Sequence, residues 1–117
     1  MSNSASQFAF APLGNTHLIA SANPAPTPVQ ISTFANQPAY GQYRIINSSA
    51  SDTCFLGVGG TAAQATARAA AIVAGTPQNT IVLAPGAVEI LRLGSDAFFT
   101  SFSTNAVNVY ITPGQGL

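Results

Sequence analysis

The last third of the chain, from Asn79 to Thr112, most constrains the fold, because it consists of short apolar segments separated by turn-forming residues. Its final segment, residues 106–112, has aliphatic side chains at every second position, which is the period of a strand with one buried face. The side chains expected to face inward are Val107, Val109 and Ile111, and those expected to face outward are Asn108, Tyr110 and Thr112. The pattern predicts antiparallel strands here.

Turn signals divide the same stretch. Pro85-Gly86 suits the two central positions of a type II turn, because proline fixes φ at the first and glycine permits a positive φ at the second. Gly94-Ser95-Asp96 marks the next turn and Thr104-Asn105 the last. Between the first two turns, residues 87–93 alternate less well. Val88 and Ile90 share a face with Arg92, which indicates either a bulge or a strand buried on both faces.

Earlier segments show the same character. Further strands are expected over Thr16–Ser21, Val29–Phe34, Gln42–Asn47 and Thr53–Val58. Apolar residues on both faces of 42–47 indicate a central strand, whereas the prolines of 23–28 exclude that segment from one. About eight short strands separated by turns are typical of an all-β, antiparallel β-sandwich, either jelly-roll-like or closed into a barrel.

One segment has helical character. Residues 61–73 are rich in alanine, the best helix former, with Thr61 as N-cap, Gly75 as C-cap and Pro77 as a stop. We expect a short helix there; a flexible alanine-rich loop is the alternative. The length of 117 residues indicates one domain, which we divide into an N-terminal arm over 1–15 and a single β-sandwich domain over 16–117.

Charge is scarce. Only 5% of the residues are charged, against about 25% in an ordinary domain, and we interpret this as a surface that a partner covers. The charged residues are Arg44, Arg68, Arg92, Asp52, Glu89 and Asp96. Zero net charge and the absence of a basic run disfavour nucleic-acid binding. The longest apolar stretch, residues 62–74, is too short and polar for a membrane span, and no signal peptide is apparent, so we expect synthesis in the cytoplasm.

Candidate chemical motifs have plainer interpretations. Residues 57–62 match G-x-G-x-x-A, the dinucleotide-binding motif, between a strand and a helix. However, no carboxylate follows at the spacing needed to hydrogen-bond the ribose of a dinucleotide. His17 is the only histidine, and Cys54 lies on the apolar face of its strand, as a small core residue does. The three carboxylates lie in turns or beside an arginine. We therefore expect no catalytic residue, no cofactor and no metal.

Aromatic and apolar side chains are better candidates for partner contacts. These candidates are Phe8, Phe10 and Leu13 in the arm, and Tyr40, Tyr43 and Tyr110 in the domain. The spacing of Phe8 and Phe10 predicts that both rings lie on one side if the segment is extended, where they would be costly to leave in water. An arm that docks on a neighbour and a frayed terminus are the two alternatives. Tyrosines are enriched at protein interfaces, although a sugar-binding platform or a place in the core are alternatives.

Three segments carry a resemblance to small virion proteins of tailed bacteriophages. They are Asn47–Gly57, Ile81–Glu89 and Val107–Gly116, which read N-x-x-x-s-d-T-x-F-x-G, then I-x-L-x-P-G-A-x-E, then V-x-V-Y-x-T-P-G-x-G. Over the last three-fifths of its length the chain resembles the capsid decoration (cement, or stapling) proteins of short-tailed phages. That resemblance implies a jelly-roll-like fold and a place on the capsid exterior. The matched motifs are strands and turns, and the arm lies outside them.

The resemblance also implies a function. A decoration protein is non-enzymatic, binds the outer surface of the capsid and staples major capsid proteins together. The partners expected on this basis are the major capsid protein and other copies of the chain, as a homodimer or, second, a trimer. Similar domains occur in phage tails and fibres, so a tail-associated module that recognises carbohydrate or the host is the alternative.

Overall fold

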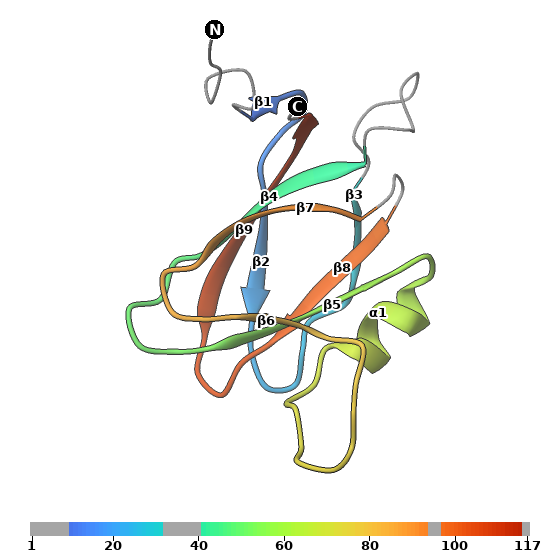
Figure 1. The fold of residues 1–117 in the computed structure, drawn as a ribbon, viewed down its shortest axis with the longest axis vertical. Coiled ribbons are helices and arrows are strands. Elements are labelled where there is room, and N and C mark those ends of the chain that lie inside the picture. The colour runs from blue at the N-terminus through green and yellow to red at the C-terminus, as the bar shows by residue number, and fades with distance from the viewer. Residues whose placement is uncertain (1–9, 32–40, 94–96, 116–117) are drawn as a thin grey trace, which may run out of the picture.

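In the computed structural model, which describes residues 10–31, 41–93 and 97–115, the chain forms two packed antiparallel sheets (Figure 1). The first sheet contains β1 (Ala11–Pro12), β2 (His17–Ser21), β4 (Gln42–Asn47), β7 (Val88–Arg92) and β9 (Val107–Gln115). The second contains β3 (Val29–Ile31), β5 (Cys54–Gly59), β6 (Ile81–Leu83) and β8 (Ala97–Phe102). The predicted all-β sandwich is confirmed. Residues 32–34 of the expected third strand, the turn at 94–96, and Phe8 and Tyr40 lie outside the described residues.

The strand order is that of a jelly roll. Apart from the short β1, the order β2-β9-β4-β7 in one sheet faces the order β3-β8-β5-β6 in the other, and the chain passes repeatedly between the sheets. β1 pairs with the same strand as β2, at the end of the sandwich where β9 finishes (Figure 1). The described part of the arm is therefore hydrogen-bonded to the first sheet, and the Leu13 amide donates to the carbonyl of Pro113 at 3.0 Å.

The core lies between the two sheets. Val107, Val109 and Ile111 are buried, as their alternation predicts, while Thr112 on the opposite face of β9 is also buried. The Thr112 hydroxyl lies 2.7 Å from that of Thr16. The predicted central position of residues 42–47 is confirmed, because β4 pairs with β9 on one side and with β7 on the other.

The described residues contain one short helix, α1 (Ala62–Arg68), which packs on the outer side of the second sheet (Figure 1). Thr61 is its N-cap, as predicted, and accepts a hydrogen bond from the amide of Gln64 at 3.2 Å. The prediction that the helix continues to residue 73 is wrong. Its last carbonyl, on Arg68, accepts a hydrogen bond from the Thr80 hydroxyl, and the Arg68 side chain donates to the carbonyl of Val58 at 2.8 Å. The backbone leaves the helical conformation at Ala69, where ψ is 76°, and the contacts of Arg68 hold this end of the helix against β5 and the segment before β6.

The glycines of the G-x-G-x-x-A motif have a packing role here. A Cβ atom on Gly57 would lie 2.6 Å from the Ala69 nitrogen and closer still to the Ala65 carbonyl oxygen. A Cβ atom on Gly59 would lie 2.5 Å from Cβ of Gln64. Real Cβ atoms do not approach other heavy atoms this closely, so α1 reaches β5 only because both positions lack a side chain.

The turn before β7 and the pairing of β7 are both regular. Gly86 has a φ of 74°, and the amide of Ala87 donates to the carbonyl of Ala84 at 2.9 Å, which confirms the predicted turn. β7 pairs with β4 in continuous register, from Arg92 opposite Gln42 to Val88 opposite Ile46. The expectation of a bulge or of two buried faces is therefore wrong: one face of β7 is simply exposed.

Buried polar groups hold the end of the sandwich where β4 finishes. Asn47 is fully buried, and its side-chain amide donates to the carbonyls of Asp52, Leu83 and Ala84 at 2.9–3.1 Å. Its side-chain oxygen accepts from the amide of Ser49 at 3.0 Å. One asparagine thus ties the turn after β4 to the turn before β7.

Cys54, which the sequence predicts to be a core residue, is fully buried at the start of β5. Burial raises the pKa of its thiol above the ordinary value, although hydrogen bonds with Ser21, Ser101 and Ser103 act in the opposite direction. The thiol therefore remains protonated and inaccessible at neutral pH.

Candidate interaction surface

The outer face of the first sheet carries a continuous row of apolar side chains. Leu18 of β2 lies opposite Tyr110 of β9, Tyr110 lies opposite Ile46 of β4, and Ile46 lies opposite Val88 of β7. Ile90 lies two residues beyond Val88 on the same face. We call these five residues the apolar stripe. The row crosses four neighbouring strands, so it spans about 14 Å at the usual strand spacing.

The apolar stripe is exposed to a degree that is unusual for such side chains. Val88, Leu18 and Ile90 are 58%, 54% and 50% exposed, while Ile46 and Tyr110 are half-buried. Burying the exposed part of each aliphatic side chain against a partner would contribute about 1 kcal/mol. Contiguous exposed apolar groups on one face of a protein mark interaction sites more often than scattered ones do.

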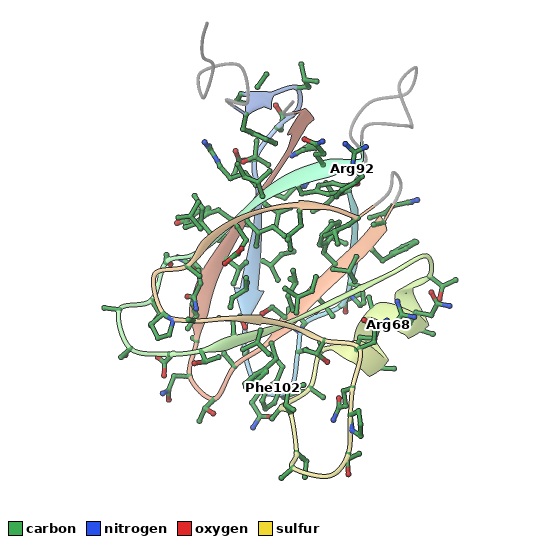
Figure 2. All side chains as sticks on the ribbon, viewed as in Figure 1. Arg68, Arg92 and Phe102 are labelled. Atoms are coloured by element: carbon green, nitrogen blue, oxygen red, sulfur yellow. The ribbon has the colours of Figure 1, made fainter. Side chains whose placement is uncertain are left out.

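The charged end of this face begins beside the stripe, because Arg44 of β4 lies opposite Ile90 of β7. The outward-facing residues of β2, β4, β7 and β9 in the described chain include two arginines, Arg44 and Arg92, and no carboxylate. Figure 2 shows Arg92 at the end of the molecule opposite Phe102. The stripe itself carries no formal charge, so contacts that it makes would depend little on ionic strength.

Phe10 covers part of the charged end. The Phe10 ring lies over the Arg44 guanidinium, with 5.6 Å between the ring centroid and Cζ of Arg44. A Cβ atom on Gly114 would lie 2.5 Å from Cζ of the Phe10 ring, so this glycine lets the ring approach the sheet closely. Nε of Arg44 is buried and has no hydrogen-bond partner among the described residues.

Replacing Gly114 with alanine should therefore detach the arm from the sheet. The new methyl group would collide with the Phe10 ring and with the backbone carbonyl of Ala11, and β1 is only two residues long. We expect the Leu13 amide to lose at least about tenfold in hydrogen-exchange protection, equivalent to about 1.4 kcal/mol of local opening. The Asn47 amide, bonded to Ala87 across β4 and β7, is the internal control and should not change. Unchanged protection at Leu13 would contradict this account of Gly114.

The residues expected at a partner contact are thus distributed unevenly. Tyr110 belongs to the apolar stripe, Leu13 is 41% exposed beside β1, and Phe10 packs against Arg44. Tyr43 instead belongs to the core: its ring meets that of Phe99 edge-on at 4.9 Å, and its hydroxyl donates to the carbonyl of Ile31 at 3.2 Å. Tyr43 lies on the inner face of β4 and is therefore not available for a surface contact.

Four of the five stripe residues were not among the sequence-based candidates. They are Leu18, Ile46, Val88 and Ile90. The available signal was the imperfect alternation of residues 87–93, where two aliphatic side chains share a face with an arginine. Such a pattern is produced equally by a second buried face and by an exposed apolar one.

The residues able to carry out chemistry are dispersed. Within residues 10–31, 41–93 and 97–115 there is no group of three or more histidine, cysteine and acidic side chains placed to hold a metal, and no pocket. Asp52 accepts a hydrogen bond from the side chain of Asn105 at 3.1 Å, as a turn residue does. No helix in the described part of the chain is long and apolar enough to cross a membrane. No family model, no curated protein and no solved structure matches the chain.

Proposed function

We propose that this protein is a non-enzymatic virion structural protein that binds the outer surface of a bacteriophage capsid and staples major capsid proteins together. The observation that carries the proposal is the apolar stripe, a row of apolar side chains without formal charge that crosses four strands of the sandwich and is largely exposed. The resemblance of residues 47–116 to capsid decoration proteins supplies the identity of the partner. The jelly-roll fold alone does not identify the partner, because it occurs in capsid and carbohydrate-binding domains alike.

The physical requirements of a staple agree with this surface. A protein that holds neighbouring capsid subunits together needs a stiff body and a broad contact, and it needs no reactive group. Apolar burial is suited to such a contact, since it is non-directional and tolerates the small differences between neighbouring capsid positions. The scarcity of charge in the chain also removes a long-range repulsion that would limit how densely copies cover a particle.

Replacing Leu18 with aspartate should weaken binding to bare capsids at least about tenfold. Leu18 is 54% exposed on β2, so its replacement does not disturb the core, but it would place an unpaired carboxylate in an apolar contact. The measurement is co-sedimentation of the purified protein with particles of the virus that encodes it, prepared without this protein. The native complex should survive a wash in moderate NaCl, because the stripe carries no charge.

The matched control for that experiment is Val82→Asp. Val82 is 51% exposed on β6 of the other sheet, so its replacement introduces the same charge at a similar exposure away from the stripe. Equal loss of binding in both variants would refute the stripe as the contact. Release of the native protein by moderate salt would argue against an apolar contact altogether. Labelling of a single vertex, or binding to a glycan array, would instead identify a tail-associated recognition module.

A further inference from the structure

β7 is an open edge of the first sheet. It pairs with β4 on one side, and no strand of the described residues pairs with it on the other. β6, an edge strand of the second sheet, has three residues, and a short edge strand is a common way to keep an edge from pairing with other chains. β7 has five residues, without proline, lysine or a bulge. It is thus a longer template for pairing than β6.

The ladder with β4 determines which backbone groups of β7 point outward. The Ala87 carbonyl accepts from Asn47, and the Leu93 amide donates to Gly41, so these flanking residues direct their backbone groups toward β4. Hydrogen-bonded and non-hydrogen-bonded positions alternate along an antiparallel pair. The amide and carbonyl groups of Val88 and Ile90 therefore point away from β4, toward the open edge.

We propose that a second copy of this chain pairs with β7, antiparallel and symmetric about Ile90. In this arrangement Ile90 of each copy exchanges two backbone hydrogen bonds with Ile90 of the other, as the self-complementary contact of a two-fold dimer requires. The two first sheets then form one continuous sheet. The inference rests on the self-association expected of the proposed staple, and it places that association at a defined strand.

The register follows from the charges and from the length of β7. Symmetry about Ile90 lets all five residues of one strand face all five of the other, with Val88 opposite Arg92. It also places Glu89 opposite Leu91, whereas symmetry about Glu89 would set two carboxylates directly against each other. The chain has a net charge of zero, so no overall repulsion opposes the approach of a second copy.

The choice of a second copy also follows from the apolar stripe. Val88 and Ile90 lie at the β7 end of the stripe, on the outer face beside the open edge. Pairing about Ile90 places Ile90 of one copy directly opposite Ile90 of the other, so that the two stripes meet at the centre of the dimer. The dimer would then present one apolar surface about twice as wide as that of a single copy, suited to a partner that spans two subunits.

Cysteine substitution tests the register directly. Ile90→Cys would place the two thiols at a hydrogen-bonded pair, where Cα atoms are about 5.5 Å apart, within the range that a disulfide bridges. Val88→Cys is the matched control on the same strand and face: its two copies would lie about 13 Å apart in this register. The native Cys54 is buried and protonated, so it does not compete. Mild oxidation of each purified variant, followed by non-reducing electrophoresis, gives the yield of linked dimer.

We expect the Ile90→Cys variant to form linked dimer at least ten times faster than Val88→Cys. Equal rates, or a faster reaction of Val88→Cys, would overturn the register, and linkage of neither would overturn the pairing. Sedimentation of the native chain supplies the second measurement, since it should show a dimer that Ile90→Pro disperses. Proline removes only the outward amide of Ile90 and leaves the ladder with β4. A monomeric native chain would overturn the proposal. Capsid binding takes no part in these measurements, so either proposal can fail without the other.

Discussion

Replacing Gly57 with alanine should destabilise the fold by about 3 kcal/mol. The added methyl group would overlap the Ala65 carbonyl oxygen and lie 2.6 Å from the Ala69 nitrogen, both of them backbone atoms that cannot rotate away. α1 must then move off β5, which would strain the hydrogen bonds that Arg68 makes with Val58 and Thr80. Urea unfolding, followed by circular dichroism, measures the loss of stability. It would be a large fraction of the 5–15 kcal/mol or so that stabilises a typical domain.

Gly60→Ala is the control for this substitution. Gly60 lies next to the same helix, but its added Cβ atom would lie 3.7 Å from the nearest heavy atom, the Gln64 side-chain oxygen, which is an ordinary contact. We expect a change of less than about 0.5 kcal/mol, because surface substitutions without a steric conflict have small effects. A loss below about 1 kcal/mol for Gly57→Ala would contradict the close approach of α1 to β5.

Replacing Asn47 with alanine should also cost about 3 kcal/mol. The substitution removes the donor shared by the carbonyls of Asp52, Leu83 and Ala84, and the acceptor for the Ser49 amide. Each buried backbone group left without a partner costs about 1–3 kcal/mol, and water can reach part of this turn and restore some of them. The free energy of unfolding in urea measures the sum.

Asn108→Ala supplies the matched comparison, because Asn108 is an exposed asparagine on the neighbouring strand β9. Its side chain should contribute less than about 0.5 kcal/mol. Hydrogen exchange distinguishes a local from a global effect in the Asn47 variant: the Ala87 amide, which closes the turn onto Ala84, should lose protection first. Similar stability of the two variants would show that Asn47 does not join the two turns.

Features that depend on neighbouring residues were predictable from the sequence. The turn at Pro85-Gly86 follows from the backbone preferences of those two residues, and the Thr61 cap from its place before a run of alanines. The inward face of β9 follows from the alternation of three aliphatic side chains. Each of these needs no knowledge of the rest of the chain.

Features that depend on distant residues were not predictable in the same way. The end of α1 is held by Thr80 and Val58, which no pattern within the helix reveals. The sequence also shows that β4 is apolar on both faces, but not that the second sheet covers only the face bearing Tyr43 and leaves Ile46 half-exposed. The stripe itself arises from the pairing of four strands, so no single segment contains it.

The position of β9 has a consequence for how the chain is made. β9 lies between β2 and β4, so Ile19 and Ile45, early in the chain, have Val109 and Ile111 as their strand partners. A ribosome produces Val109 and Ile111 well after Ile19 and Ile45. The first sheet therefore cannot assemble until β9 has been made, and β2 stays without its strand partner until then. Contacts so distant along the chain slow folding, and unpaired apolar strands favour aggregation in the interval. Folding of the first sheet should thus follow the synthesis of β9 rather than that of its N-terminal strands.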